Sequence, residues 1–562
     1  MENEDPKSEV PFIHDVLIIG AGPCGLAVAS RMREATPSSL FTDIEHQRYH
    51  WLRSQKGRVP VLKTKGRAQR KVLLEDDNIS ISPTNEKDLK YSILVLDSTS
   101  STYLGRWRKL FEALEIKTLR SPLFFHVDPQ DRDGLKEFAY ANGRVDEMIE
   151  IKGVVGKEKS KHQVKKERKK RPTREIHSGK SIDERDKQDY FTPSTQLFED
   201  YCQKCVDKYH LGNVVQQSDV QSIKWCPNGS NDSPDRCWIV NTGTGTHLAR
   251  AVVLAIGPGT PTPVPISPQE QEGACHSSQI SLRGPVPEHV GLKMKAEKES
   301  YVIVVGGGLT SAQIADLCVR NGYTKVFMIM RSNLKIKHFD LELEWVAKYK
   351  NLQLAYFWGT ADPEARSEII KLARNGGSIP LAYVKALEQH RSHGKLSILT
   401  QTTIVEKTWN AEAKTWSVKT EPPIPDLPDI DFIFFATGAV ADYEKSPLLK
   451  PLQETNPVKF QDGLPCVTED LQWNREVPLF FTGRSAALQL GPGAANLEGA
   501  RMGAERIVPR VQEILDELLD NKASKRSNKA GIKDLRERYA LGTTHLNMYT
   551  ALAKNNDYDE EN

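Results

Sequence analysis

The hydrophobic pattern near the N-terminus predicts a strand, a glycine turn and a helix. Residues 15–19 form a short β-branched apolar run, and residues 26–32 continue as a helix of small residues after three glycines. A second apolar run, at residues 40–45, is predicted to be the next strand. Strand, turn, helix and strand in this order open a doubly wound parallel sheet.

The same pattern returns after residue 300. A strand at 301–305 is followed by glycines at 306–308, a helix at 310–320 and a second strand at 325–330. We therefore predict an α/β fold with two Rossmann-like dinucleotide-binding domains, the second inserted into the first.

The remaining periodicity gives the other expected elements and the domain boundaries. Helices are expected at 103–114 and 193–209 and strands at 222–225, 238–241, 251–257 and 432–435, whereas 53–90 has no clear period. The predicted domains are 1–290 with a basic insertion at 152–188, an inserted domain at 295–430, a return to the first domain at 431–519, and a polar tail at 520–562.

Charge is concentrated in one segment. Residues 152–187 carry fourteen Lys or Arg against six Asp or Glu, an excess of +8 in a chain of net charge +3, which leaves about −5 elsewhere. A mildly acidic body argues against nucleic-acid binding. The basic run 165–171 resembles a nuclear-import signal, although a solvated loop is the favoured reading. No stretch of eighteen apolar residues occurs, so we expect no membrane helix.

The eight cysteines are irregularly placed and do not form a disulfide framework. Such cysteine usage fits a reducing compartment, so we expect a cytoplasmic protein. Cys202 and Cys205 have Cys-x-x-Cys spacing, but they lie in the middle of an amphipathic helix, and the structural reading is favoured over a redox pair. No metal site is expected, because no His or Cys cluster has ligand spacing.

Both glycine turns have the residue spacing of a diphosphate-binding site. The first glycine of such a turn permits the tight bend, the second admits the diphosphate, the third allows close helix packing, and the helix N-terminus favours an anion. The first turn contains Gly20, Gly22, Pro23 and Gly25, and the second contains Gly306, Gly308 and Ser311.

The residue that ends the strand after each turn indicates which dinucleotide that turn binds. Glu45, with Asp43 as its rival, is predicted to accept hydrogen bonds from ribose hydroxyls after the first turn. After the second turn this place is taken by Arg331, which suits the 2′-phosphate of NADPH, with Lys335 and Lys337 adding positive charge. NADPH is therefore favoured over NADH.

These motifs, in this order, resemble the class B flavoprotein monooxygenases. The resemblance rests on the two turns, on Phe435-Ala436-Thr437-Gly438 and on a late Gly483 before a glycine-rich helix start. It implies FAD on the first domain, NADPH on the second, and O₂ and a small molecule as substrates. In this family a flavin C4a-(hydro)peroxide oxygenates a nucleophile. Alternatives are an NADPH-dependent flavin reductase or oxidase, and a non-catalytic FAD-binding redox sensor.

The resemblance also suggests further site residues. Gly483, Gly491, Gly493 and Asn496 resemble the final flavin contact, at a helix N-terminus that can stabilise negative charge on the flavin. The segment 273–278 resembles the His-Ser element before the nicotinamide domain but lacks the full Baeyer–Villiger fingerprint. N-hydroxylation or oxygenation at nitrogen or sulfur is therefore favoured, N-hydroxylation foremost.

Two histidines are weak catalytic candidates. His276 lies in that linker element, where a hydrogen-bonded structural role is favoured over proton transfer. His126 follows Phe124 and Phe125 in a loop that relatives place beside the isoalloxazine ring, although a buried loop anchor explains these residues equally well. The sequence does not identify the substrate.

Overall fold

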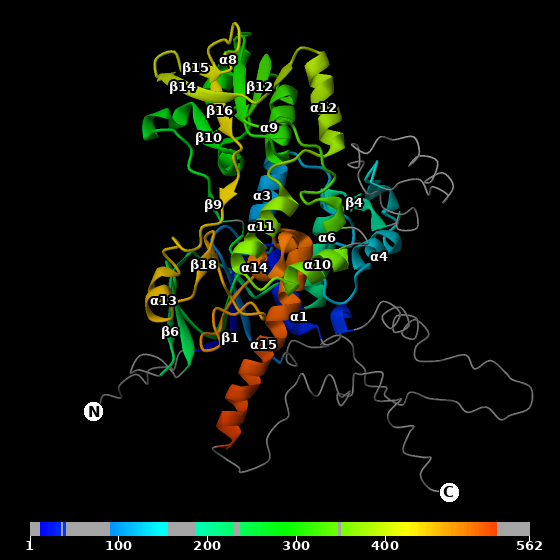
Figure 1. The fold of residues 1–562 in the computed structure, drawn as a ribbon, viewed down its shortest axis with the longest axis vertical. Helices are drawn as coiled ribbons and strands as arrows, with labels where there is room; N and C mark the ends of the chain where they lie inside the picture. Colours follow the sequence, from blue (N-terminus) through cyan, green and yellow to red (C-terminus); the bar gives the residue numbers. More distant parts are fainter. Residues whose placement is uncertain are drawn as a thin grey trace, which may run out of the picture.

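The computed structural model describes residues 12–34, 37–40, 90–154, 187, 189–228, 236–257, 259–346 and 350–524. Two α/β domains lie one above the other in Figure 1, with the chain crossing twice between them. The predicted fold class, two Rossmann-like domains with the second inserted into the first, is confirmed.

The first domain is built on a seven-stranded sheet. Its order is β5 (Val215–Gln217), β2 (Ile93–Asp97), β1 (Ile13–Ile19), β8 (Gly245–Leu254), β7 (Cys237–Thr242) and β6 (Val220–Cys226), with β20 (Leu479–Phe481) also beside β8. β1 pairs in parallel with β2 and with β8. Because β1 has a partner on each side and is covered on both faces, Val16, Leu17 and Ile18 are fully buried.

The strand after the first glycine turn is not the predicted one. Among the described residues, the parallel partner of β1 on this side is β2, at 93–97, and β8 occupies the other side. Residues 41–89, including Glu45 and Asp43, lie outside the described residues. The nucleotide fold therefore includes a long insertion between its first helix and its second strand.

The second domain contains a five-stranded parallel sheet. Its order is β10 (Ala274–His276), β16 (Phe432–Phe435), β11 (Tyr301–Val305), β12 (Lys325–Met330) and β13 (Leu396–Thr400). β10 and β16 belong to this sheet although they lie outside the segment 295–430 predicted for the inserted domain. The chain crosses between domains at the antiparallel pair β9 (Thr260–Pro261) and β17 (Ala439–Val440).

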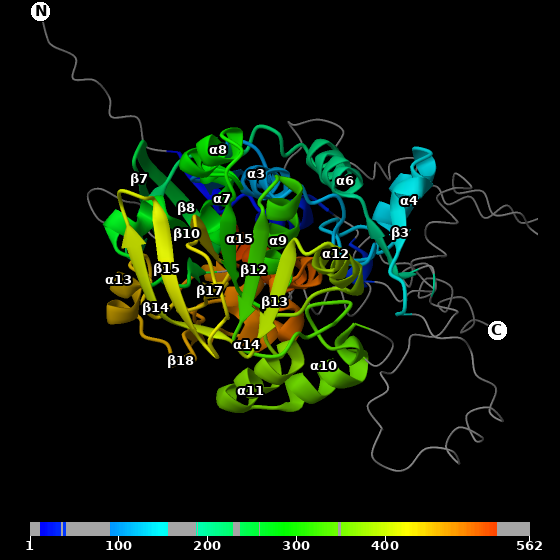
Figure 2. The ribbon, with the colours of Figure 1, turned by 90° about the horizontal axis from the view of Figure 1, so that it is seen from above.

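Helices cover both sheets, and Figure 2 shows them from above. α1 (Pro23–Arg33) packs against α15 (Leu497–Ser524), and α9 (Leu309–Arg320) packs against α12 (Leu381–Ser392). α3 (Gly105–Ala113) lies between the two sheets in Figure 1. The remaining helices are α4 (Gly134–Ala141), α6 (Thr195–Lys208), α7 (Ile280–Arg283), α8 (Glu288–Lys295), α10 (Lys350–Gly359), α11 (Pro363–Arg374), α13 (Lys450–Thr455) and α14 (Ala487–Leu490).

Three further antiparallel strand pairs complete the described fold. They pair β3 (Met148–Glu150) with β4 (Phe191–Pro193), β14 (Thr403–Asn410) with β15 (Thr415–Glu421), and β18 (Phe460–Gln461) with β19 (Leu464–Pro465). The structure has α10, α11 and α12 where the sequence interpretation assigned no element. For α11 the signals were present, since Asp362 caps its N-terminus ahead of Pro363 and it ends at Asn375 in the left-handed region.

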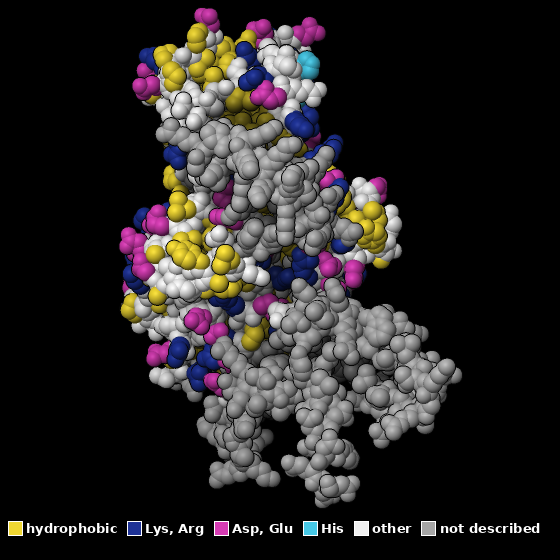
Figure 3. All heavy atoms as spheres, turned by 45° about the vertical axis from the view of Figure 1, so that its right-hand side comes forward, with side chains coloured by type: hydrophobic (Ala, Val, Ile, Leu, Met, Phe, Trp, Pro, Cys, Tyr) yellow, Lys and Arg dark blue, Asp and Glu magenta, His cyan; other side chains and the backbone are white. Residues whose placement is uncertain are grey.

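The surface is mixed in charge. On the face shown in Figure 3, Lys and Arg side chains alternate with Asp and Glu over the coloured residues. Within the described ranges, no helix is both long enough and apolar enough to span a bilayer.

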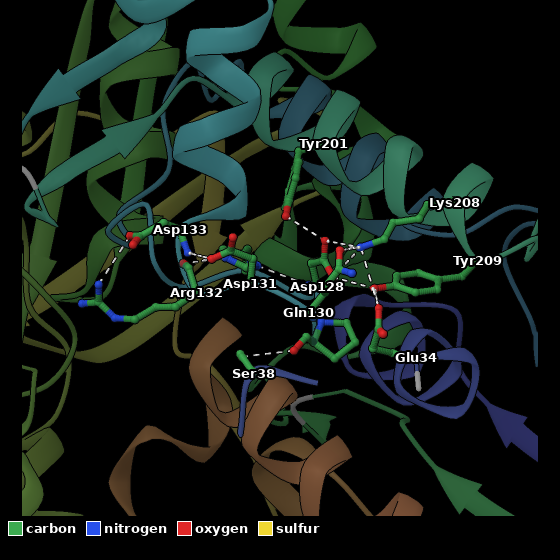
Figure 4. Close-up of polar contacts among 12 residues, drawn as sticks. Glu34, Ser38, Asp128, Gln130, Asp131, Arg132, Asp133, Tyr201, Lys208 and Tyr209 are labelled. Atoms are coloured by element: carbon green, nitrogen blue, oxygen red, sulfur yellow. Dashed lines mark hydrogen bonds and ion pairs between the residues drawn. The ribbon is translucent and has the colours of Figure 1, made fainter. Parts of the chain in front are cut away.

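A buried polar network fixes the loop from Leu119 to Asp133 against α6 (Figure 4). Both Asp128 oxygens accept tyrosine hydroxyls, from Tyr201 at 3.0 Å and Tyr209 at 2.7 Å, and the Lys208 ammonium lies 3.2 Å away. Tyr209 also donates to Glu34, just after α1, at 2.8 Å. Burial opposes ionisation of Asp128, but Lys208 and the hydrogen bonds outweigh it and lower its pKa.

We expect Asp128→Ala to lower the free energy of unfolding by roughly 3 kcal/mol, because it leaves the buried Tyr201 hydroxyl without its acceptor, removes one acceptor of Tyr209 and takes away the carboxylate paired with Lys208. A carboxylate whose pKa is lower in the folded than in the unfolded state stabilises the fold at pH values above the ordinary carboxyl pKa. This stabilisation is lost as the pH falls through the pKa of the folded state. The wild type should therefore lose stability below about pH 4, and the variant should lack this component.

Urea unfolding at pH 7 and at pH 3.5 measures both effects. Asp207→Ala, which replaces an exposed acid on the same helix whose carboxylate accepts the Gln203 side-chain amide, is the matched control and should stay within about 0.5 kcal/mol of wild type. Equal loss in the two variants would contradict the role given to Asp128.

Candidate functional site

A cleft of about 930 Å³ lies between the two domains. The first domain contributes Pro23 and Cys24 at the start of α1, the turn after β20, and the start of α15. The second domain contributes Leu309 and Thr310 at the start of α9, and the start of α12. The N-termini of the two turn helices therefore face one cavity, as a site for two dinucleotides requires.

The first glycine turn has room for a ligand. Gly20 has φ +111°, and a Cβ on it would lie 2.3 Å from the carbonyl oxygen of Ala255, so only glycine fits. A Cβ on Gly22 would meet nothing within 4 Å. The position where a diphosphate approaches is thus open, and the residues present fit a dinucleotide.

The second glycine turn has the same bend but a covered face. Gly306 has φ +149°, and a Cβ there would lie 2.4 Å from the carbonyl oxygen of Ala436. A Cβ on Gly377 would lie 3.1 Å from the Gly308 nitrogen, so the loop after α11 rests on this turn. The Ser311 hydroxyl donates to the Gly308 carbonyl at 2.6 Å.

The predicted basic residues after β12 divide into two kinds. Arg331 is exposed directly after the strand. Lys335 donates to the Asn375 carbonyl at 2.8 Å, and Lys337 donates to the Arg374 carbonyl at 3.0 Å. The two lysines therefore hold the loop that covers the second turn.

Asp97 is a candidate site residue that the sequence interpretation missed. It ends β2, the place where a Rossmann sheet puts its ribose-binding acid. One of its oxygens accepts the Ala21 amide of the glycine turn at 2.9 Å, and the other accepts the Thr99 amide at 2.8 Å. The apolar run of β2 ending in an acid was the signal, hidden by the long insertion before it.

The late glycine-rich segment meets the cleft only in part. Gly483 and Asn496 line it, and the Asn496 amide donates to Asp340 at 3.2 Å. Gly491 faces Phe357 instead, and Gly493 lies near Glu498, so neither lines the cleft.

Both candidate histidines lie outside the cleft lining and have structural partners. The Nε2 of His126 lies 2.8 Å from the Arg132 carbonyl and its Nδ1 accepts the Asp128 amide at 3.2 Å, and burial lowers its pKa to about 4. His276 contacts the Gly438 carbonyl at 3.0 Å and accepts the Ser278 amide at 3.1 Å. The hydrogen-bonded reading of His276 therefore agrees with the geometry. Of the neighbouring aromatics, Phe125 lines the cleft.

The Cys-x-x-Cys pair is buried in α6. Burial raises the pKa of Cys202 and of Cys205 well above the ordinary thiol value, so both stay protonated near neutral pH. Both are free thiols. These observations favour the structural reading. Over the described part of the chain, no group of His, Cys, Asp and Glu could hold a metal ion.

Arg120 joins the two domains across the cleft. From the loop after α3, its guanidinium donates to the carbonyls of His338 at 3.1 Å and Phe339 at 2.6 Å and to the Ser378 hydroxyl at 2.9 Å. Burial lowers its pKa to about 10, so it remains charged near neutral pH. Its partners are more than 200 residues away in sequence, so no local pattern could reveal this role.

Comparison with known proteins agrees with this architecture. Residues 179–438 match the family model for L-lysine 6-monooxygenase/L-ornithine 5-monooxygenase. No curated protein matches the chain. The resemblance to class B flavoprotein monooxygenases is confirmed. The matched family is one of oxidoreductases, and FAD and NADPH stay predictions for this chain.

Solved structures share the two-domain fold. An ornithine N-hydroxylase from Kutzneria sp. 744, solved with reduced FAD, NADP⁺ and L-ornithine, is 16% identical with a TM-score of 0.55, covering 89% of this chain and 99% of its own. An ornithine hydroxylase from Pseudomonas aeruginosa is 14% identical with a TM-score of 0.55, covering 90% and 100%. An L-lysine 6-monooxygenase from Pseudomonas syringae is 15% identical with a TM-score of 0.53, covering 89% and 100%.

We expect Arg120→Ala to lower the free energy of unfolding by roughly 2–4 kcal/mol, because carbonyls on the second domain lose a charged donor. Arg120→Lys should recover only part of this, since an ammonium cannot reproduce the planar fork. Urea unfolding measures the effect, and Arg106→Ala, an exposed arginine on α3, is the matched control. Full recovery by lysine would contradict the fork-dependent contact.

Proposed function

We propose that this chain is an FAD- and NADPH-dependent monooxygenase that oxygenates a small-molecule nitrogen nucleophile. The observation that carries the proposal is the single cleft onto which the starts of α1 and α9 both open. When bound, the flavin supplies the chemistry that activates O₂ at its C4a carbon, and NADPH supplies the electrons. The chain's own task is to hold the two nucleotides face to face and to exclude water.

In this proposal the first domain holds FAD. The open space at Gly22 and the N-terminus of α1 receive the diphosphate. Gly483 and Asn496 lie against the flavin, because they line the cleft beside α1. Asp97 is the carboxylate that β2 offers to the ribose. Glu45 stays a prediction, as it lies outside the described residues.

The second domain then holds NADPH. Arg331 is exposed at the end of β12, where it can pair with a 2′-phosphate. A diphosphate that approached Gly308 as one approaches Gly22 would displace the loop around Gly377. NADPH binding therefore includes movement of this loop, which Lys335 and Lys337 hold at its base.

Gly22→Val tests the FAD site. The added side chain enters open space, so the fold should be retained while the diphosphate is excluded, and the purified protein should be colourless. Gly212→Val is the matched control, because a Cβ there also meets nothing within 4 Å and Gly212 lies outside the cleft. FAD content from the absorbance spectrum and circular dichroism measure the two effects. A yellow Gly22→Val protein would contradict the assignment.

Arg331→Ala tests the NADPH site. We expect the KM for NADPH to rise about tenfold or more, because a charge-assisted contact to phosphate is lost, while the KM for NADH and the FAD content stay unchanged. Steady-state oxidation of both nucleotides measures the split. An equal rise for NADPH and NADH would show that Arg331 does not contact the 2′-phosphate.

Product analysis tests the reaction class. Stoichiometric oxygenated amine per NADPH consumed supports the monooxygenase. Hydrogen peroxide as the sole product from every amine offered would favour the flavin reductase or oxidase alternative.

A further inference from the structure

Asp340 lies in the cleft lining and contacts two elements that are far apart in the sequence. Its Oδ1 accepts the side-chain amide of Asn496, directly before α15, at 3.2 Å. Its Oδ2 accepts a guanidinium N–H of Arg374, the last residue of α11, at 2.9 Å. One carboxylate therefore joins the start of α15 to the end of α11.

Arg374 extends this link in both directions. Its guanidinium also donates to the Pro492 carbonyl at 3.1 Å, in the glycine-rich segment that leads to Asn496. Its own carbonyl accepts the Lys337 ammonium at 3.0 Å. Residues 375–377, here called the covering loop, follow Arg374 directly and rest on the second glycine turn at Gly308. The covering loop is thus tied through Arg374 to the segment proposed to contact the flavin.

Asp340 also determines how Asn496 presents its side chain. A carboxamide offers two N–H donors and one acceptor oxygen, whereas a carboxylate only accepts. The amide nitrogen of Asn496 must therefore face Asp340, as the contact at 3.2 Å shows. One N–H and the oxygen remain for a ligand in the cleft, which Asn496 also lines.

We propose that Asp340 is a positioning residue that acts through Asn496 and Arg374, so that displacement of the covering loop by NADPH changes the placement of Asn496 against the flavin. The inference rests on the proposed function, which assigns the flavin to Asn496 and the nicotinamide nucleotide to the second turn. The link is reciprocal, because any contact at one site that biases the loop must bias binding at the other site equally.

The contacts determine the sign of the expected effect. The pair of Asp340 and Arg374 holds the end of α11 and so favours the resting position of the covering loop. A nucleotide that binds only when the loop is displaced gains apparent affinity when the resting position is weakened. Each side chain of the pair is 34% exposed, so we expect a change of a few-fold and not of orders of magnitude.

NADP⁺ binding to the FAD-loaded full chain tests this sign. Asp340→Asn and Arg374→Gln should each lower the Kd for NADP⁺ about threefold, measured by titration calorimetry. The two substitutions change the local charge in opposite directions, so tightening in both cannot come from charge alone. Substitutions that merely disturbed the structure would weaken binding.

The double variant and a matched control complete this experiment. Asp340→Asn combined with Arg374→Gln should bind NADP⁺ as either single variant does, because both remove one contact. Glu368→Gln removes an exposed ion pair with Lys371 on the same helix, outside the cleft, and should leave the Kd unchanged. An unchanged or raised Kd in Arg374→Gln, or additive effects in the double variant, would overturn the inference.

The flavin spectrum tests the other end of the link. Arg374 does not line the cleft, so Arg374→Gln can reach the flavin only through its partners. We expect it to shift the flavin absorbance maximum in the same direction as Asn496→Ala does, whereas Glu368→Gln leaves the spectrum unchanged. A wild-type spectrum in FAD-loaded Arg374→Gln would contradict the link to the flavin.

Hydrogen exchange separates failure of the inference from failure of the proposed function. In FAD-loaded Asn496→Ala, the amides of residues 375–379 should exchange at least about threefold faster than in the wild type, without any nicotinamide nucleotide present. Faster exchange supports the link even if the wild type binds no NADP⁺, a result that would overturn the proposed function alone. Unchanged exchange in this loop would overturn the inference while NADP⁺ binding by the wild type left the proposed function standing.

Discussion

The structure depends on two close approaches between a glycine and the end of a neighbouring strand. Gly20 lies against Ala255 after β8, and Gly306 lies against Ala436 after β16, at distances that leave no room for a side chain. Each approach bends the chain from a central parallel strand directly into a helix. Because the same contact is made in both domains, both helix N-termini reach the same side of their sheets, the prerequisite for one shared cleft.

The parts that the sequence predicted best are those determined by local pattern. The strands at 301–305, 325–330 and 432–435 appear with the expected bounds, because each is an apolar run that is fully enclosed in a parallel sheet. The pairing of strands was harder to predict. The insertion at 41–89 separates β2 from the turn that it follows in space, so sequence proximity pointed to 40–45.

The site depends on contacts that no local pattern encodes. Arg120 and His338 are 218 residues apart, and the apolar side of α3 meets the cleft only because the second domain docks on Leu114 and Ile116. The helix predicted at 103–114 is present as α3, but a helical pattern does not show whether its apolar face packs in a core or lines a cavity. Likewise His126 and the two cysteines of α6 look chemically suggestive in sequence, and burial with satisfied partners gives them structural roles.

On the proposed function, the difference between the two turns fits a resident nucleotide at the first and an exchanging nucleotide at the second. A Cβ on Gly22 would meet nothing within 4 Å, whereas the loop around Gly377 rests on Gly308. The apparent affinity of a covered site is the affinity of the uncovered site multiplied by the fraction of molecules in which the cover is displaced. A flavin that must stay through many turnovers suits the open turn. A nicotinamide nucleotide that must enter and leave suits the turn whose cover is held by a few lysine-to-carbonyl contacts.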